Sequence, residues 1–357
     1  MADPDEPSRP SAGASLAEET GCGNSRHRGN QRLSATIDDI YAPIQAELHA
    51  TRARLLDERT RCDPRLADFV DYATRSSGKL VRPALLLLAG RACGELSQAH
   101  VEAAAVVELV HTATLIHDDV IDEAQERRRD ATAAVRWGSD LSIMLGDLLF
   151  ARAIERFALV AGPREQRILT RAIHEVCEGE LLQLLSRREG TIDEQAYIQI
   201  VSKKTGALCA AACALGAAFA GVADDRLAPF AHFGRAVGTA LQIADDCLDI
   251  RGDEHTVGKT LGLDLLGGKL TLPLIAVREH GTPEQRRRLE ALVATPEDDG
   301  WRARLAAHLA ESGAFGYCER TAHSVVDQAA ASLAVLGECP AVGSLLALAD
   351  FVIRRDR

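Results

Sequence analysis

Two clusters of aspartates, each at the end of an apolar run with helical spacing, constrain this chain more than any other feature. The first lies in residues 111–130, HTATLIHDDVIDEAQERRRD. On a helix, Asp118 and Asp122 stand one turn apart on one face, with Asp119 beside them. Three carboxylates so close repel one another and need compensation if they are buried. Magnesium shared between the protein and a diphosphate supplies that compensation; the alternative is a solvated acidic helix end.

The second cluster, in residues 241–250 (LQIADDCLDI), repeats the arrangement with Asp245, Asp246 and Asp249. Gln242 precedes it by one helical turn, and apolar residues again surround the acids. Two such clusters are hard to explain as solvated faces. Two facing acidic helix ends that bind one metal–diphosphate group explain both.

Composition predicts an all-α fold in a chain of 357 residues. Aromatic residues make up 4% of the chain and hydrophobic residues 46%, and long Ala/Leu/Val runs have helical spacing. Residues 1–33 are polar and aperiodic, which predicts a disordered tail. We expect one all-α domain over residues 34–357, with Ser34 as the first helix cap.

Charge and cysteine content exclude several classes of function. A net charge of −11 argues against nucleic-acid binding. Nine cysteines without a CxxC pair argue against disulfides and structural zinc. We find no apolar run of transmembrane length and no signal-peptide core, and therefore expect a cytoplasmic protein.

Lysines are rare enough to be informative, since only five occur among 41 basic residues. An ammonium group does not replace a guanidinium fork in a tight phosphate site, so lysines kept in an arginine-rich chain are candidates for chemistry. Chance is the alternative. The five are Lys79, Lys203, Lys204, Lys259 and Lys269.

The neighbours of these lysines indicate anion binding. In SSGKLVRP, residues 76–83, Lys79 and Arg82 flank the start of a helix. Residues 258–273, GKTLGLDLLGGKLTLP, describe a glycine-rich cationic loop without the features of a nucleotide P-loop. His111 lies seven residues before Asp118, on roughly the same helical face.

Further long helices are expected over residues 97–123, 139–160, 163–188 and 193–220. Glu180 and Gln183 of the third either line a cavity or lie on an amphipathic surface, and we favour the surface. In the fourth, Lys204 and Thr205 precede a run of small residues. That run allows close helix packing, leaves room for a substrate chain, or reflects the coding bias that favours arginine.

With these motifs in order, the chain from about residue 36 onward resembles the trans-polyprenyl diphosphate synthases of the isoprenoid-synthase fold. It is most similar to the bacterial octaprenyl and other long-chain synthases. The resemblance implies a helical bundle around a deep cavity and a homodimer that uses three magnesium ions per site. It also implies that isopentenyl diphosphate and an allylic diphosphate are the substrates, and that the product goes to a membrane.

The resemblance also implies a role for each matching residue. Metal would be bound by Asp118, Asp122, Asp245 and Asp249, with Asp119, Asp246 and Lys204 also catalytic. The isopentenyl diphosphate would be held by Lys79, Arg82, His111 and Arg128. The allylic substrate would contact Arg127, Lys204, Thr205 and Gln242, with Lys259 and Lys269 closing over its diphosphate. Arg129 and Ser77 stand where the family usually has glycine.

Product length follows from the same resemblance. Ala113 and Thr114 lie about 7 Å before Asp118 on the helix, where the tail of a growing chain would pass. Short-chain members of the family have an aromatic residue near these positions. Both residues are small here, and so is Ala133 beyond the basic run, which favours a long-chain product over a farnesyl or geranylgeranyl one.

Three other functions fit parts of the pattern. A terpene cyclase of the same fold would need only one aspartate cluster and no SSGKLVRP turn. A non-catalytic partner subunit would usually have a damaged cluster. A purely structural helical protein would leave the lysines unexplained. We therefore expect a prenyltransferase.

Overall fold

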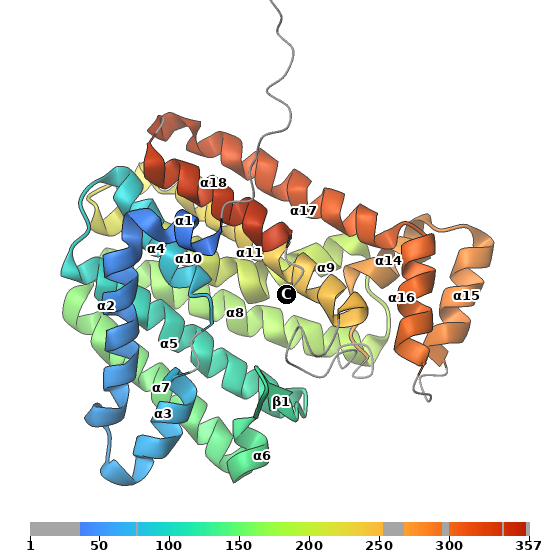
Figure 1. Cartoon of the computed structure of the whole chain (residues 1–357), viewed down its shortest axis with the longest axis horizontal. Coiled ribbons are helices and arrows are strands. Elements are labelled where there is room, and N and C mark those ends of the chain that lie inside the picture. The colour runs from blue at the N-terminus through green and yellow to red at the C-terminus, as the bar shows by residue number, and fades with distance from the viewer. Residues whose placement is uncertain (1–35, 76–77, 253–267, 295–299, 338, 355–357) are drawn as a thin grey trace, which may run out of the picture. The chain divides into compact units, whose positions relative to one another are not determined.

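Helices dominate the computed structural model, which describes residues 36–75, 78–252, 268–294, 300–337 and 339–354 (Figure 1). This confirms the all-α prediction. Within these residues, the strands β1 (Glu126–Arg127) and β2 (Asp130–Ala131) form a small antiparallel hairpin. The helices are α1 (Ile37–Tyr41), α2 (Gln45–Leu56), α3 (Ala67–Arg75), α4 (Val81–Cys93), α5 (Gln98–Ile121), α6 (Ala133–Trp137), α7 (Ser139–Val160), α8 (Pro163–Glu189), α9 (Glu194–Val201), α10 (Ala207–Phe219), α11 (Ala228–Arg251), α14 (Leu272–His280), α15 (Pro283–Ala294), α16 (Trp301–Glu311), α17 (Ala314–Ala330) and α18 (Pro340–Ile353). The predicted tail lies outside the described residues.

Helix ends follow local capping chemistry. At the start of α5, the Ser97 amide donates a hydrogen bond to His100 Nδ1 at 3.0 Å. Helix α1 begins after Thr36, whose hydroxyl accepts from the Asp39 amide at 3.2 Å. Thr36 therefore caps the first described helix, and Ser34, where a cap was expected, lies outside the described residues. Helices α7 and α8 begin and end within one residue of the predicted bounds.

Close helix packing explains the run of small residues after Lys204. Helix α10 packs against α4, α8 and α11. A side chain at Gly216 of α10 would place its Cβ 2.0 Å from the Leu86 carbonyl oxygen of α4. On α11, a Cβ at Gly234 would lie 2.3 Å from the Cys209 carbonyl oxygen. The backbones approach so closely that only small residues fit, which brings both α4 and α11 against α10.

The expectation that no apolar run reaches transmembrane length needs correction. Two segments, Gln98–Ile121 and Glu194–Phe219, are long and apolar enough to cross a membrane by length and composition. In the bundle, 67% of the most apolar 18-residue stretch of the first segment is buried, and 83% of that of the second. Sequence inspection underestimated their apolarity because polar residues interrupt them, histidines in the first segment and Lys203 and Lys204 in the second. Both are core helices.

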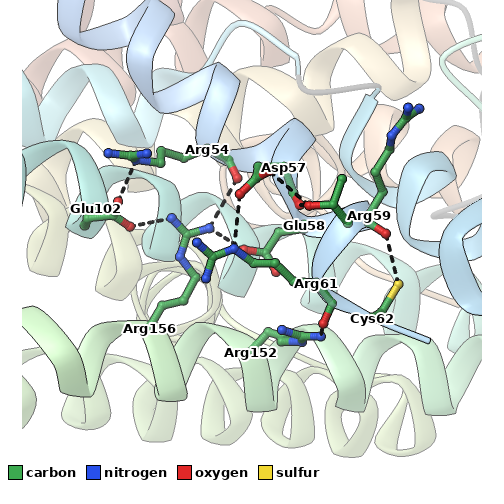
Figure 2. A network of polar contacts seen from close by, with 10 residues as sticks. Arg54, Asp57, Glu58, Arg59, Arg61, Cys62, Glu102, Arg152 and Arg156 are labelled. Carbon is green, nitrogen blue, oxygen red and sulfur yellow. Dashed lines mark hydrogen bonds and ion pairs between the residues drawn. The ribbon is translucent and has the colours of Figure 1, made fainter. Parts of the chain in front are cut away.

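A buried ionic network joins α2, α5 and α7 away from the aspartate clusters (Figure 2). Arg156, 5% exposed on α7, donates hydrogen bonds to Glu58 and Glu102 and to the Arg54 carbonyl oxygen. Arg54 Nε also lies 2.6 Å from Glu102. Because a guanidinium has five donors, one side chain connects three segments here.

We expect Gly216→Ala to lower the free energy of unfolding by about 1–3 kcal/mol, because the new methyl group meets rigid backbone. Gly343→Ala on α18 is the matched control. A Cβ added at Gly343 would have no heavy atom of the described residues within 4 Å, and alanine favours helix by ~1 kcal/mol. Urea unfolding followed by circular dichroism measures both. Equal stabilities would contradict the close approach of α10 to α4.

Candidate active site

A cavity of about 560 Å³ lies between α4, α5, α8 and α11 and has both polar and apolar lining residues. The polar lining includes Lys79, Arg82, Glu108, His111, Asp118, Arg127, Arg128, Glu180, Lys204, Thr205, Gln242 and Asp245. The apolar lining, called the apolar wall below, includes Leu115, Phe150, Val176, Leu181, Leu184 and Leu241. The structure therefore gathers most of the predicted site residues around one cavity.

The three carboxylates of the first cluster have different surroundings. Asp118 is partly exposed to the cavity. Asp119 is 3% exposed, and Arg127 Nε donates to its two oxygens at 2.8 and 2.9 Å. Burial raises the pKa of Asp119, against the lowering effect of Arg127. Asp122 is the C-terminal cap of α5, and its Oδ1 atom lies 2.8 Å from Nη1 of Arg187 on α8. Asp119 is thus engaged by the protein, while Asp118 faces the cavity.

Lys204 reaches the first cluster from a π-helical turn, Ser202–Gly206, that interrupts the predicted helix between α9 and α10. Its Nζ lies 2.5 Å from Glu180 and 3.5 Å from Asp118. A Cβ at Gly179 of α8 would lie 2.5 Å from the Lys204 amide nitrogen, so the glycine lets this turn approach α8. Single π-helical turns often occur at functional sites.

The assignment of Glu180 and Gln183 to an amphipathic surface was wrong. Glu180 lines the cavity, and Gln183 is 4% exposed. Burial and the charge of Asp118 raise the pKa of Glu180, against the lowering effect of Lys204. Their helix is amphipathic, but these two side chains lie on its inner face.

In the second cluster, Asp246 is a buried hydrogen-bond acceptor rather than a cavity residue. It is fully buried and accepts from Tyr197 Oη at 2.6 Å, Gln242 Nε2 at 2.9 Å and Lys269 Nζ at 3.0 Å. Asp245 lines the cavity, and Asp249 is 2% exposed one turn further along α11. Asp246 therefore positions Gln242 and Lys269.

The basic turn lies at the start of α4, as predicted. Lys79 and Arg82 both line the cavity, and Leu80 between them has a positive φ of 52°. A left-handed conformation at a non-glycine residue costs about 1 kcal/mol or more and is typical of functional sites. Arg82 Nε is buried and has no hydrogen-bond acceptor among the described residues. An anion in the cavity would supply one.

His111 is held neutral. Burial and the guanidinium groups of Arg82 and Arg128 keep its pKa well below the ordinary value for histidine. Glu108, one turn earlier on α5, is 4% exposed. Burial raises the pKa of Glu108, against the effect of the same two arginines.

The β1–β2 hairpin places the basic run, and sequence analysis did not predict it. Its turn residues Arg128 and Arg129 have φ angles of 54° and 66°. Such two-residue turns normally contain glycine or asparagine. The glycine expected at position 129 would fit this backbone without strain. Arg128 nonetheless reaches the cavity, and a Cβ at Gly78 would lie 2.6 Å from its Nη2 atom.

The remaining predicted residues divide between cavity, core and undescribed chain. Thr205 Oγ1 donates to Gln242 Oε1 at 2.7 Å, so the structure brings these two together. Thr114 lines the cavity, whereas Ala113 is fully buried and outside its lining. Ala133 is also buried at the start of α6. Lys259 and Ser77 lie outside the described residues.

Four site residues were missed: Glu108, Glu180, Tyr197 and Arg187. Glu108 could have been found, because it lies three residues before His111 on the same helix. Arg187 and Tyr197 reach aspartates from other helices, and Glu180 reaches Lys204 of the π-helical turn. Helical periodicity carries no signal for such contacts.

The bundle and its internal cavity define an all-α enzyme whose site lies among the helices. A family model described as Polyprenyl synthetase matches residues 63–308. The octaprenyl diphosphate synthase of Escherichia coli (strain K12) is 36% identical over 289 residues, covering 80% of this chain and 88% of its own. The all-trans-nonaprenyl-diphosphate synthase (geranyl-diphosphate specific) of Rhodobacter capsulatus is 35% identical over 305 residues, covering 84% and 92%.

Comparison with solved structures indicates the same family. A polyprenyl synthase from Caulobacter crescentus CB15, crystallised with calcium and isoprenyl diphosphate, is 33% identical with a TM-score of 0.83. The match covers 92% of this chain and 100% of that one. The chain belongs to the polyprenyl synthetase family of prenyltransferases, which join isopentenyl and allylic diphosphates in isoprenoid biosynthesis.

Substitutions of Asp246, which is fully buried, and of Asp118, which is partly buried, should differ in their effect on the free energy of unfolding. Asp246→Ala leaves Lys269 and Gln242 without their acceptor and should cost about 3–5 kcal/mol. Asp118→Asn relieves repulsion in the cavity and should change stability by less than about 1 kcal/mol. Urea unfolding measures both variants. An equal loss would contradict the distinction between a buried acceptor and a cavity carboxylate.

Proposed function

We propose that the protein is a magnesium-dependent synthase that condenses isopentenyl diphosphate head-to-tail with an allylic diphosphate and releases a long-chain product. One observation carries the proposal: Asp118 and Asp245, from two different helices, line the same cavity as five cationic side chains. A lining that combines acids and bases suits metal-bound diphosphates, and its apolar side chains suit hydrocarbon.

The donor set fits magnesium. Asp118 and Asp245 offer carboxylate oxygens to the cavity, and Asp122 Oδ1 is buried without a hydrogen-bond donor among the described residues. Hard oxygen ligands beside a diphosphate are what magnesium prefers. We infer that Asp118, Asp122, Asp245 and Asp249 hold three ions per site. When bound, magnesium stabilises negative charge on the departing diphosphate.

The cationic side chains divide between the two substrates. We assign Lys79, Arg82, His111 and Arg128 to isopentenyl diphosphate, with the His111 ring as a hydrogen-bond donor. We assign Arg127, Lys204, Thr205 and Gln242 to the allylic substrate, and Lys259 and Lys269 to its diphosphate. Lys204 and Arg127 pair with acids of the site, so the diphosphate exchanges one anionic partner for another.

The chain's own residues then stabilise ionisation rather than attack the substrate. The cationic side chains favour departure of the allylic diphosphate by offsetting its developing negative charge. The alkene of isopentenyl diphosphate, held at the basic turn, attacks the allylic cation, and the released diphosphate takes the proton. The apolar wall keeps water from the cation.

We further propose that the enzyme works in the cytoplasm as a homodimer. Large apolar side chains on α7 and α8 are exposed, including Met144 at 61%, Leu159 at 79% and Leu185 at 50%. Exposed apolar residues grouped on two helices are typical of subunit interfaces.

The functional test uses purified protein, labelled isopentenyl diphosphate and primers of increasing length. We expect prenyl diphosphates with magnesium, none with EDTA, and recovery when magnesium is restored. Asp245→Asn should lower turnover by about 10²-fold or more. Cyclic hydrocarbon products would indicate a terpene cyclase, and a folded protein without turnover would indicate a partner subunit.

Product length depends on the apolar wall. Each added isoprene unit buries five carbons, worth roughly 4 kcal/mol at ~0.8 kcal/mol per methylene. Elongation therefore continues until a side chain blocks the path. Thr114 leaves the first part of the wall open, and Phe150 of α7 is the largest apolar side chain on it. We infer a product of about seven to ten units, by family resemblance; a shorter farnesyl or geranylgeranyl product is the alternative.

Thr114→Phe should shorten the product by one or more five-carbon units, because a ring enters the path of the chain. Thin-layer chromatography of the dephosphorylated products measures this. Ala113→Phe is the control: it overpacks the core by about 1–3 kcal/mol without entering the cavity. An unchanged product from Thr114→Phe would mean that the chain does not pass this residue.

A further inference from the structure

Helix α8 carries a cation, Arg187, that belongs to none of the motifs found in the sequence. It lies seven residues after Glu180, and therefore on the same face of α8. Its side chain is 13% exposed, and its Nη1 atom lies 2.8 Å from Asp122 Oδ1.

With Arg187 included, each carboxylate of the first cluster has a cation beside it. Lys204 of the π-helical turn lies 3.5 Å from Asp118 and is shared with Glu180 at 2.5 Å, and Arg127 of β1 contacts Asp119 at 2.7 Å. Arg187 lies 2.8 Å from Asp122. Cations from three different elements therefore offset the repulsion among the three carboxylates in part.

The Arg187–Asp122 pair is held by charge and lacks hydrogen-bond geometry. Asp122 Oδ1 and Arg187 Nε are both buried, and neither has a hydrogen-bond partner among the described residues. Arg156, by contrast, donates hydrogen bonds to both of its glutamates (Figure 2). The pair at Asp122 keeps unused bonding capacity on both sides.

We propose that Arg187 is a positioning residue that competes with divalent metal for Asp122 and thereby couples metal binding to diphosphate binding. The inference rests on the proposed function. A metal ion on Oδ1 must displace Arg187 or bear its repulsion, which weakens binding of metal alone. The displaced guanidinium then lacks an anion, and a diphosphate supplies one. Each ligand therefore increases the affinity for the other.

The test measures Mn²⁺ binding by electron paramagnetic resonance, with and without inorganic diphosphate. Arg187→Gln should tighten binding of Mn²⁺ alone on the order of three- to tenfold, because a nearby positive charge is lost. The same variant should reduce the factor by which diphosphate tightens Mn²⁺ binding. Arg187→Lys keeps the charge and should restore most of both effects.

Arg188→Gln is the matched control, since it removes the same charge from an exposed neighbouring side chain. It should leave Mn²⁺ affinity within about twofold of the original protein, because exposed charges are screened. Equal responses of Arg187→Gln and Arg188→Gln would overturn the inference. So would weaker Mn²⁺ binding by Arg187→Gln with a lowered melting temperature, which would make Arg187 a structural tether.

Failure of the proposed function is distinguishable from failure of the inference. An original protein that binds no Mn²⁺ even with diphosphate overturns both. An original protein that binds Mn²⁺ and loses binding in Asp118→Asn, but does not respond to Arg187→Gln, retains the proposed function and overturns the inference alone.

Discussion

Repulsion between carboxylates is the constraint on which the arrangement of this bundle depends. Asp118, Asp119 and Asp122 fall within five residues at the end of α5, where burial makes an uncompensated charge costly. Compensation comes from Lys204, Arg127 and Arg187, none of which lies on α5. The π-helical turn, the hairpin and α8 must therefore all meet at this point. Because a diphosphate and metal ions can replace these partners, the same charges that constrain the fold prepare the site for its substrates.

Close packing makes that convergence possible. The small side chains of α10 let it approach α4 and α11, and Gly179 lets α8 approach the π-helical turn that carries Lys204. With larger side chains at these contacts, the helices would separate by several ångströms and the charges would no longer meet. The alanine- and glycine-rich sequence therefore has a packing role, whatever bias also contributed to it.

Sequence analysis predicts neighbours along a helix better than neighbours between helices. The aspartate clusters, the basic turn and the ends of α7 and α8 follow from periodicity and capping, which depend on residues three or four positions apart. The contacts of Arg187 with Asp122 and of Tyr197 with Asp246 depend on how helices cross, and no local pattern encodes that. The hairpin at Arg128 was missed because its turn lacks the usual glycine. Ala113 and Thr114 show that prediction is also limited within one helix. These adjacent residues point in different directions, and only Thr114 faces the cavity.

Two kinds of buried ionic contact have different consequences for function. At Arg156, hydrogen bonds to Glu58 and Glu102 satisfy the charges, so changing a partner would leave a buried charge without compensation (Figure 2). At Asp122, opposite charges meet without hydrogen bonds, so the cost of exchanging one partner for another is lower. A site that binds and releases charged groups at each turnover needs the second kind, because tightly satisfied pairs would oppose every exchange. Incomplete hydrogen bonding beside the cavity is thus compatible with stability only because complete networks such as that of Arg156 lie elsewhere in the bundle.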